Sequence, residues 1–237
     1  MIKVILSIFQ AIGQAIGTEI LSFLLGAIIG NLRFLRIFFQ SLGRYRKDIR
    51  VSCAYLFRIK VRDEYLLIRG NNIEQYQPVG GVYKYFDSFK SKKEELEIVD
   101  ETKDNFYEEN DLRVVIRGKY LTKFLSWFDS RKNREISVVR ELLEELGTTE
   151  ANDIELIKSA HVEFLKQIKE PIKYSKHFEV DEIKILDIFK VEIPEQLLDS
   201  IIEQKNIQLV TKNDIRKECF MLDGKSHKIA ETAKHIV

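Results

Sequence analysis

The feature that most limits the fold of this chain is a nearly uncharged segment at its N-terminus. Residues 1–32 contain only two charged side chains, Lys3 and Glu19, although the 237 residues include 38 Lys and Arg and 37 Asp and Glu. The rest of the chain is therefore densely charged, yet it is rich enough in Ile, Leu, Val and Phe to build a core, which excludes a disordered chain. The sequence predicts an apolar head joined to a charged globular body.

Three interpretations of the apolar head are open. A secretory signal peptide has one apolar run before its cleavage site, but here a second run, Ile20–Leu32, lies beyond any plausible site. A buried helix of a globular domain would keep a polar face, and this head has almost no charge on any face. Membrane insertion fits the composition better. The polar stripe changes face at Gly17-Thr18, which predicts two helices near residues 2–16 and 19–42.

A basic junction follows the apolar head. Residues 31–50 carry six basic groups and one acidic group, so their net charge is +5, whereas residues 51–237 have a net charge of −4. By the positive-inside rule, this asymmetry places the body on the cytoplasmic side of a membrane. The alternative for the same residues is a solvated linker. We therefore expect a membrane-embedded helical segment at residues 1–43 and a cytoplasmic domain at residues 44–237.

Charge and cysteine content exclude other classes. The net charge of +1 is too small for a strongly basic nucleic-acid binder, so no duplex nucleic acid is expected as a partner. Cys53 and Cys219 are far apart and lack the paired spacing of a zinc site. They are predicted to be reduced core residues of a cytosolic domain.

Short apolar runs separated by turn residues predict an α+β body with a mixed sheet. Strands are expected over residues 50–60, 64–69, 112–117, 182–193 and 207–210, with a short extended segment at 74–79. Helices are expected over residues 120–128, 135–146, 196–203 and 227–237. The charged, apolar-poor stretch 87–111 is expected to be a flexible loop, and the aromatic cluster Phe124, Trp127 and Phe128 is expected to lie in the core.

The most informative motif is an acidic helical segment. Glu141, Glu144 and Glu145 are spaced i, i+3 and i+4, so three carboxylates crowd one helix face at a cost of several tenths of a kcal/mol per pair. Bound Mg²⁺ or Mn²⁺ would offset this repulsion, because hard cations prefer oxygen ligands. The alternative is a solvated acidic face with Leu142 and Leu146 in the core.

Residues 140–147, Arg-Glu-Leu-Leu-Glu-Glu-Leu-Gly, resemble the second half of the Nudix box, and Pro78-Val79-Gly80-Gly81 is similar to its entry. The resemblance covers roughly residues 50–237 and implies a Nudix-like mixed-sheet sandwich. It implies that Glu141, Glu144 and Glu145 are metal ligands, together with the Gly80 carbonyl. It also implies catalytic roles for Glu144 and Glu145 if the domain is active, and structural roles for Arg140, Gly81 and Gly147.

Two departures from the Nudix pattern bear on catalysis. About 45 residues are inserted between the glycine and arginine of the box, so the insertion spans about residues 82–133. The position of the first glutamate of the family is Lys132, whose ammonium group could occupy the space of a cation. These departures favour a domain that binds nucleotides over an active hydrolase.

The order of apolar head, basic junction and Nudix-like body with a split box resembles the SMODS-associated Nudix family. This resemblance implies a bacterial inner-membrane effector of cyclic-oligonucleotide-based anti-phage signalling (CBASS). Such an effector would bind a cyclic oligonucleotide messenger, form homo-oligomers and disrupt membrane lipid. The alternative implied by the Nudix box is a Mg²⁺-dependent, membrane-tethered hydrolase of nucleoside diphosphate derivatives.

Candidate messenger contacts are basic groups near expected strand ends. They are Arg69, Lys84, Arg117, Lys119 and, in a later basic stretch, His177. Tyr83 or Tyr85 could stack on a base. The competing interpretation is ordinary surface charge for the basic residues and core packing for the two tyrosines.

Overall fold

The computed structural model describes residues 34–70, 73–101, 108–138 and 160–237, with single residues 142, 145, 146, 155 and 157 between the last two ranges. Most of the expected membrane segment lies outside these residues. Its end is a helix over residues 34–42. Within the described ranges, none of the helices is long and apolar enough to cross a membrane.

The organising element is β1 (Asp48–Val61), a 14-residue strand whose side chains alternate between two faces. Ile49, Val51 and Cys53 point into the main core. Arg50 and Leu56 point to the opposite face, where Leu56 belongs to a second core. Because both faces carry buried residues, β1 must be covered on both sides.

β1 is paired along both edges. One edge pairs in parallel with β9 (Val180–Glu192). The other pairs with β6 (Arg113–Arg117), then β4 (Gly80–Val82), and finally with β2 (Glu64–Arg69). The remaining strands extend these edges: β3 (Tyr76–Pro78) and β10 (Ile207–Thr211) on β2, β5 (Val99–Asp100) on β6, and β7 (His161–Lys169) and β8 (Lys173–Ser175) on β9.

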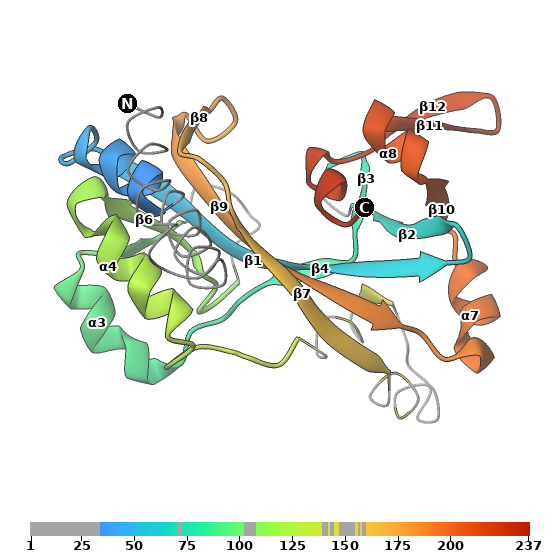
Figure 1. Cartoon of the computed structure of the whole chain (residues 1–237), viewed down its shortest axis with the longest axis horizontal. Coiled ribbons are helices and arrows are strands. Elements are labelled where there is room, and N and C mark those ends of the chain that lie inside the picture. The colour runs from blue at the N-terminus through green and yellow to red at the C-terminus, as the bar shows by residue number, and fades with distance from the viewer. Residues whose placement is uncertain are drawn as a thin grey trace, which may run out of the picture.

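Helices and a small hairpin cover the two faces (Figure 1). The main core includes residues of α4 (Gly118–Asp129) and α7 (Glu195–Ile202), while α3 (Lys90–Glu95) lies beside α4. The second core is closed by α8 (Lys212–Lys217), the hairpin of β11 (Cys219–Leu222) and β12 (Lys225–Lys228), and the terminal 3₁₀ helix η2 (Glu231–His235). The predicted α+β class with a mixed sheet is confirmed, and most of the strand pairings are antiparallel.

Three sequence predictions were wrong. Residues 87–111 are not a flexible loop where they are described, because they form η1 (Asp87–Phe89), α3 and β5 and bury Phe89 and Leu96. Residues 227–237 form the end of β12 and η2 in place of an α-helix. Residues 135–138 are not helical, so the acidic helix begins later than residue 135.

The predictions for the cysteines and the aromatic cluster hold, except for the core position of Cys219. Both cysteines are free thiols, but Cys219 is partly exposed and belongs to neither core, whereas Cys53 is buried. Phe124, Trp127 and Phe128 lie in the main core.

Gly118 allows α4 to begin directly against the turn that follows helix 34–42. Its backbone N–H donates to the Lys47 carbonyl (3.0 Å), and a Cβ at this position would lie 2.3 Å from the Arg44 carbonyl oxygen. Such a contact is far inside van der Waals distance, so the backbone of the turn would have to move. The glycine therefore fixes how closely helix 34–42 and α4 approach.

We predict that Gly118→Ala lowers the free energy of unfolding by about 1–3 kcal/mol, the usual cost of overpacking. Gly43→Ala is the matched control, because a Cβ there would meet only ordinary contacts at 3.7 and 3.8 Å. Urea unfolding of both variants measures the difference. Equal stability of the two variants would contradict the proposed close approach.

Candidate functional site

A cleft of about 540 Å³ lies on the face of β1 that carries Arg50. Its walls come from β1, the β2–β4 region, the segment around β6, and the turn between β8 and β9. The charged and histidine side chains that line it are Arg50, Arg69, Glu101, Glu108, Asp111, Arg113, Glu145, His177, Glu182 and Lys184. Its volume falls within the usual range for sites that bind small molecules.

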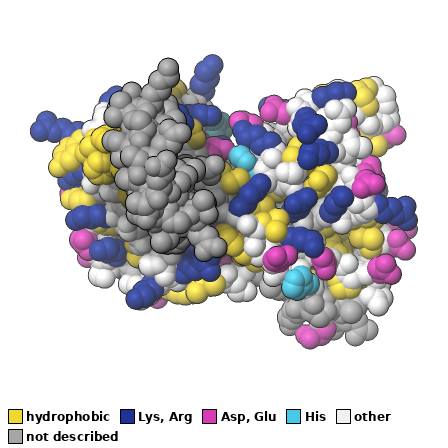
Figure 2. Space-filling model, viewed as in Figure 1, with side chains coloured by type: hydrophobic (Ala, Val, Ile, Leu, Met, Phe, Trp, Pro, Cys, Tyr) yellow, Lys and Arg dark blue, Asp and Glu magenta, His cyan; other side chains and the backbone are white. Residues whose placement is uncertain are grey.

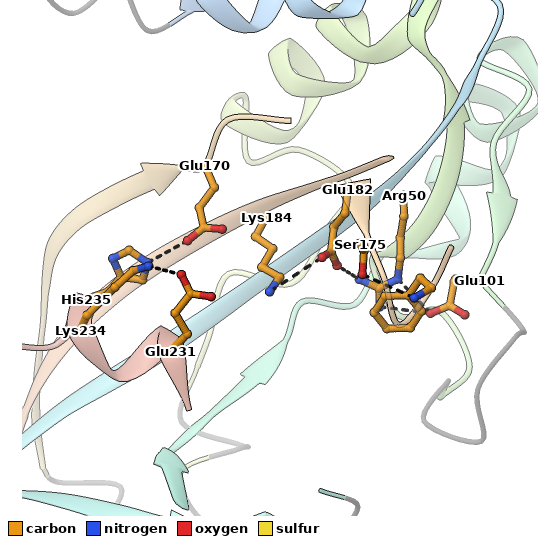
Figure 3. A network of polar contacts seen from close by, with 10 residues as sticks. Arg50, Glu101, Glu170, Ser175, Glu182, Lys184, Glu231, Lys234 and His235 are labelled. Atoms are coloured by element: carbon orange, nitrogen blue, oxygen red, sulfur yellow. Dashed lines mark hydrogen bonds and ion pairs between the residues drawn. The ribbon is translucent and has the colours of Figure 1, made fainter. Parts of the chain in front are cut away.

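A buried ion-pair network forms one wall of the cleft (Figure 3). The Arg50 guanidinium donates to Glu182 on the neighbouring strand β9 and to Glu101 (Nη2–Oε2 3.1 Å). The Phe178 ring lies against the same guanidinium, 3.6 Å from its carbon to the ring centroid. Lys184 lies one side-chain repeat further along β9, 3.8 Å from Glu182.

The parallel register of β1 and β9 produces this network, because Arg50 lies directly beside Glu182. All three side chains of the Arg50–Glu101–Glu182 set are less than 10% exposed. Charges at this depth must be paired, and removing one partner of such a set typically costs about 3–5 kcal/mol. The network therefore holds the cleft wall in one arrangement.

Asp111 is a further buried acid that lines the cleft. Its carboxylate lies 3.3 Å from Arg113 Nη1 and accepts a hydrogen bond from the Glu108 backbone N–H. Lys84 forms an isolated antiparallel β-bridge with Asp111, and its Nζ lies 2.8 Å from Glu108 Oε2. Burial raises the pKa of Asp111 to about 6, although the Arg113 charge opposes this shift.

The backbone of Gly80 and Gly81 lines part of the cleft. A Cβ on Gly80 would lie 2.2 Å from the Tyr55 carbonyl oxygen, so only glycine permits this approach to β1. The Val79 carbonyl accepts from Phe57 N–H, and Tyr83 N–H donates to the Cys53 carbonyl. Because such bonds alternate along an antiparallel pair, the Gly80 carbonyl points away from β1.

Glu145 lines the same cleft as Gly80 and Gly81, so the structure brings together these three predicted residues. Two oxygen donors, the Glu145 carboxylate and the outward Gly80 carbonyl, suit a hard cation such as Mg²⁺ or Mn²⁺. Arg140, Glu141, Glu144 and Gly147 lie outside the described residues. The described part of the chain contains no cluster of three or more metal-ligating side chains.

The predicted messenger contacts fall in two places. Arg69 and His177 line the cleft, and Lys84 is joined to the lining residue Glu108. Arg117 and Lys119 lie elsewhere, around a second pocket of about 340 Å³ formed with Tyr45, Arg46 and Glu97.

The hypothesis that Tyr83 or Tyr85 stacks on a base is wrong, because both are buried in the main core. The Tyr83 hydroxyl donates to Asp187 (2.7 Å), and the Tyr85 hydroxyl lies 3.3 Å from Asp100. Burial beside the Asp187 carboxylate raises the pKa of Tyr83 far above its ordinary value. Both rings therefore support the sheet.

Several residues of the site were missed at the sequence level. Arg50, between the apolar residues Ile49 and Val51, is an unusual charge in a buried strand and could have been noticed. Its partner Glu182 lies 132 residues away, and the local pattern holds no sign of their pairing. Arg134 was also missed. It is 2% exposed, and its guanidinium lies over the Phe128 ring and donates to the carbonyls of Phe128 and Glu135, which fixes the segment leading to the acidic helix.

The mixed sheet, with Gly80-Gly81 and Glu145 at one cleft, agrees with the Nudix resemblance of the sequence. A family model described as the SMODS-associated NUDIX domain matches residues 48–237, and the chain belongs to this family. Comparison with curated proteins and with solved structures gave no match. Membership in this family associates the chain with CBASS, as a Nudix effector.

The raised pKa of Asp111 leads to a prediction about pH. A buried acid whose pKa is raised from 3.8 to about 6 favours the folded state at low pH, and this contribution is lost as the pH rises through 6. Between pH 4.5 and 7.5 the loss is about 2 kcal/mol. The free energy of unfolding of Asp111→Asn, relative to wild type, should rise by about this amount over that interval.

Urea unfolding at the two pH values measures this difference. Asp63→Asn, in the exposed β1–β2 turn, is the matched control for loss of a surface carboxylate. A difference between Asp111→Asn and wild type that stays constant over this interval would show that Asp111 titrates at its ordinary pKa.

Proposed function

We propose that this protein is a membrane-associated effector of a bacterial CBASS anti-phage system, and that its Nudix cleft binds a cyclic oligonucleotide messenger. Binding drives homo-oligomerisation and disruption of the inner membrane, with the Nudix domain on the cytoplasmic side. The observation that carries the proposal is the cleft of about 540 Å³, with cationic groups and a preformed Arg50 network, in a domain of this family.

The cleft offers both kinds of contact that a cyclic oligonucleotide needs. Arg69, Lys184 and His177 provide donors for phosphodiester oxygens. The carboxylates of Asp111 and Glu108 can accept hydrogen bonds from the amino and imino groups of bases. This mixture of signs favours a ligand with several phosphates and several bases over a simple anion.

The membrane component of the proposal rests on the sequence. Residues 1–32 contain two charged side chains, and the +5 junction that follows them favours a cytoplasmic body. Oligomerisation through the head would explain the polar stripe that changes face at Gly17-Thr18 and the Gly13-x₃-Gly17 and Gly26-x₃-Gly30 spacings, which let membrane helices approach closely.

A Mg²⁺-dependent hydrolase is the second candidate, and the acidity of the cleft favours it. Among the described residues, five carboxylates line the cleft against four Arg and Lys side chains. A divalent cation held by Glu145 and the Gly80 carbonyl would let a diphosphate enter this acidic site and would polarise the attacking water. The Nudix resemblance of the sequence assigns two further carboxylates, Glu141 and Glu144, to the same metal site.

Lys184→Gln tests messenger binding. Loss of one charge-assisted contact to phosphate should weaken binding about tenfold. Lys190→Gln is the matched control, because Lys190 is on the same strand but pairs with Glu192 outside the cleft. Isothermal titration of the full-length protein with a panel of cyclic di- and trinucleotides measures the affinities.

The proposal fails if no cyclic nucleotide of the panel binds the wild-type protein. It also fails if both lysine variants weaken binding equally, since the effect would then reflect overall charge and not the cleft.

The double variant Glu144→Gln with Glu145→Gln separates the two candidate functions. If the protein is an effector without catalysis, messenger-triggered leakage of a dye from vesicles should survive the double substitution, since neither carboxylate would be needed to assemble the membrane segments. If it is a hydrolase, Mg²⁺-dependent cleavage of nucleoside diphosphate derivatives should be present in the wild type and fall at least a hundredfold in the variant. Detecting that cleavage together with loss of leakage would overturn the effector proposal.

A further inference from the structure

Helix 34–42 presents two different stripes. Phe34, Ile37 and Ser41, spaced i, i+3 and i+7, face the body, where Ile37 is 2% exposed. A second stripe, spaced i, i+3, i+4 and i+7, is apolar and faces outward: Leu35, Phe38, Phe39 and Leu42. Phe39 is 65% exposed, the most of the four. A solvated helix would carry polar residues on such a face.

This helix is fixed to the Nudix domain and is not a free linker. The Gln40 side chain accepts from the Ile172 backbone N–H (3.1 Å), and Arg44 forms an ion pair with Asp181 at the start of β9 (2.9 Å). Gly118, at the start of α4, packs closely against the backbone of Ser41 and Arg44. The direction of the apolar stripe is therefore set by the fold of the domain.

A basic pocket adjoins the end of the apolar stripe. Tyr45 connects them, since its N–H donates to the Leu42 carbonyl and its own carbonyl accepts from the Lys119 N–H. The pocket is lined by Tyr45, Arg46, Glu97, Arg117 and Lys119. Among the described lining residues, Glu97 is the one acid beside three bases, and it accepts from Lys119 (3.0 Å) and from the Tyr120 hydroxyl. The pocket thus keeps an excess of positive charge.

We propose that the apolar stripe and this basic pocket form one docking surface for an anionic lipid bilayer, here called the boundary surface. Its residues are Leu35, Phe38, Phe39, Leu42 and Tyr45, with the cations Arg46, Lys47, Arg117 and Lys119. The apolar side chains enter the headgroup–acyl boundary, and the cations bind lipid phosphates. In Figure 2, hydrophobic side chains with Lys or Arg beside them lie at the upper left edge, over the blue helix of Figure 1.

Two observations favour a lipid surface as the occupant. The boundary surface follows directly after residues 1–32, the segment with two charged side chains, so a membrane that holds that segment lies within reach. Apolar side chains flanked by cations also complement one leaflet of an anionic bilayer, because the apolar groups match the acyl chains and the cations match the headgroup phosphates. This inference rests on the membrane component of the proposed function and is independent of what the cleft binds. It reassigns Arg117 and Lys119 from the messenger to lipid.

Tryptophan fluorescence of the full-length chain in vesicles tests the proposal. The wild-type chain has one tryptophan, the buried Trp127, which gives the background. Phe39→Trp places a reporter on the boundary surface. Met221→Trp is the matched control, on an exposed position of β11 at the opposite end of the molecule. Vesicles of phosphatidylcholine and phosphatidylglycerol contain phosphatidylcholine brominated in its acyl chains, and iodide serves as the aqueous quencher.

We expect brominated lipid to quench the Trp at position 39 and not that at position 221, and iodide to do the reverse. Arg46→Gln with Lys47→Gln should reduce the quenching by lipid. Each basic group near an anionic surface contributes about a factor of 5, so losing two lowers the docked-to-undocked ratio about 25-fold. Lys225→Gln with Lys228→Gln, on exposed positions of β12, is the charge-matched control and should leave the quenching unchanged.

The other outcomes separate two kinds of failure. If the chain floats with the vesicles but iodide quenches both reporters equally, the head is in the membrane and the boundary surface does not dock. If neither quencher reaches the reporter at position 39, protein covers this face, which overturns a lipid occupant. If the chain does not float with vesicles at all, the membrane component of the proposed function fails, and this inference fails with it.

Discussion

The parallel pairing of β1 with β9 is the interaction on which the rest of the molecule depends. It runs through eleven consecutive residue pairs, from Ile49–Asp181 to Ile59–Val191. Parallel strands at the centre of a sheet are usually covered on both faces. Here α4 packs on one face of the pair, and a C-terminal layer of α8, the β11–β12 hairpin and η2 packs on the other. The cleft occupies the part of the second face, near the start of both strands, where polar side chains replace that apolar layer.

The ion pairs of this strand pairing contribute more to a fixed arrangement of the cleft wall than to the stability of the fold. Arg50, Glu101 and Glu182 are buried charged groups, and replacing all members of such a set together by apolar residues of similar volume is often neutral or stabilising. What the ion pairs supply is a cleft wall with a fixed arrangement, with Phe178 held over the Arg50 guanidinium. A ligand that meets such a wall loses less free energy to ordering the site than one that must assemble it.

Sequence patterns predicted the elements that show a local periodicity of apolar residues. The β1 and β9 strands and α4 were found from apolar alternation or periodicity, and Gly80, Gly81 and Glu145 were assigned to one site from the Nudix resemblance, where the cleft brings them together. Long-range pairings were not predictable in this way. Arg50 meets Glu182 only through the sheet register. Arg117 was expected near the cleft, but it lies beside Asp48 at the start of β1, whereas Gly80 lies beside Leu56 further along the strand. Residue order gives no sign of these registers. The charged stretch 87–111 was taken for a loop because its buried residues, such as Phe89, are sparse.

The start of β9 joins the two surfaces of the molecule. Asp181 holds Arg44 and with it helix 34–42, and the next residue, Glu182, holds Arg50 in the cleft wall. Neighbouring residues of a strand point to opposite faces, so one short stretch of backbone is constrained from both sides. A ligand couples the two surfaces only if it binds one arrangement of this stretch more tightly than another. The two ion pairs involve adjacent residues of β9. A shift of Glu182 in the cleft wall therefore takes place next to the Asp181–Arg44 ion pair, which sets the position of helix 34–42.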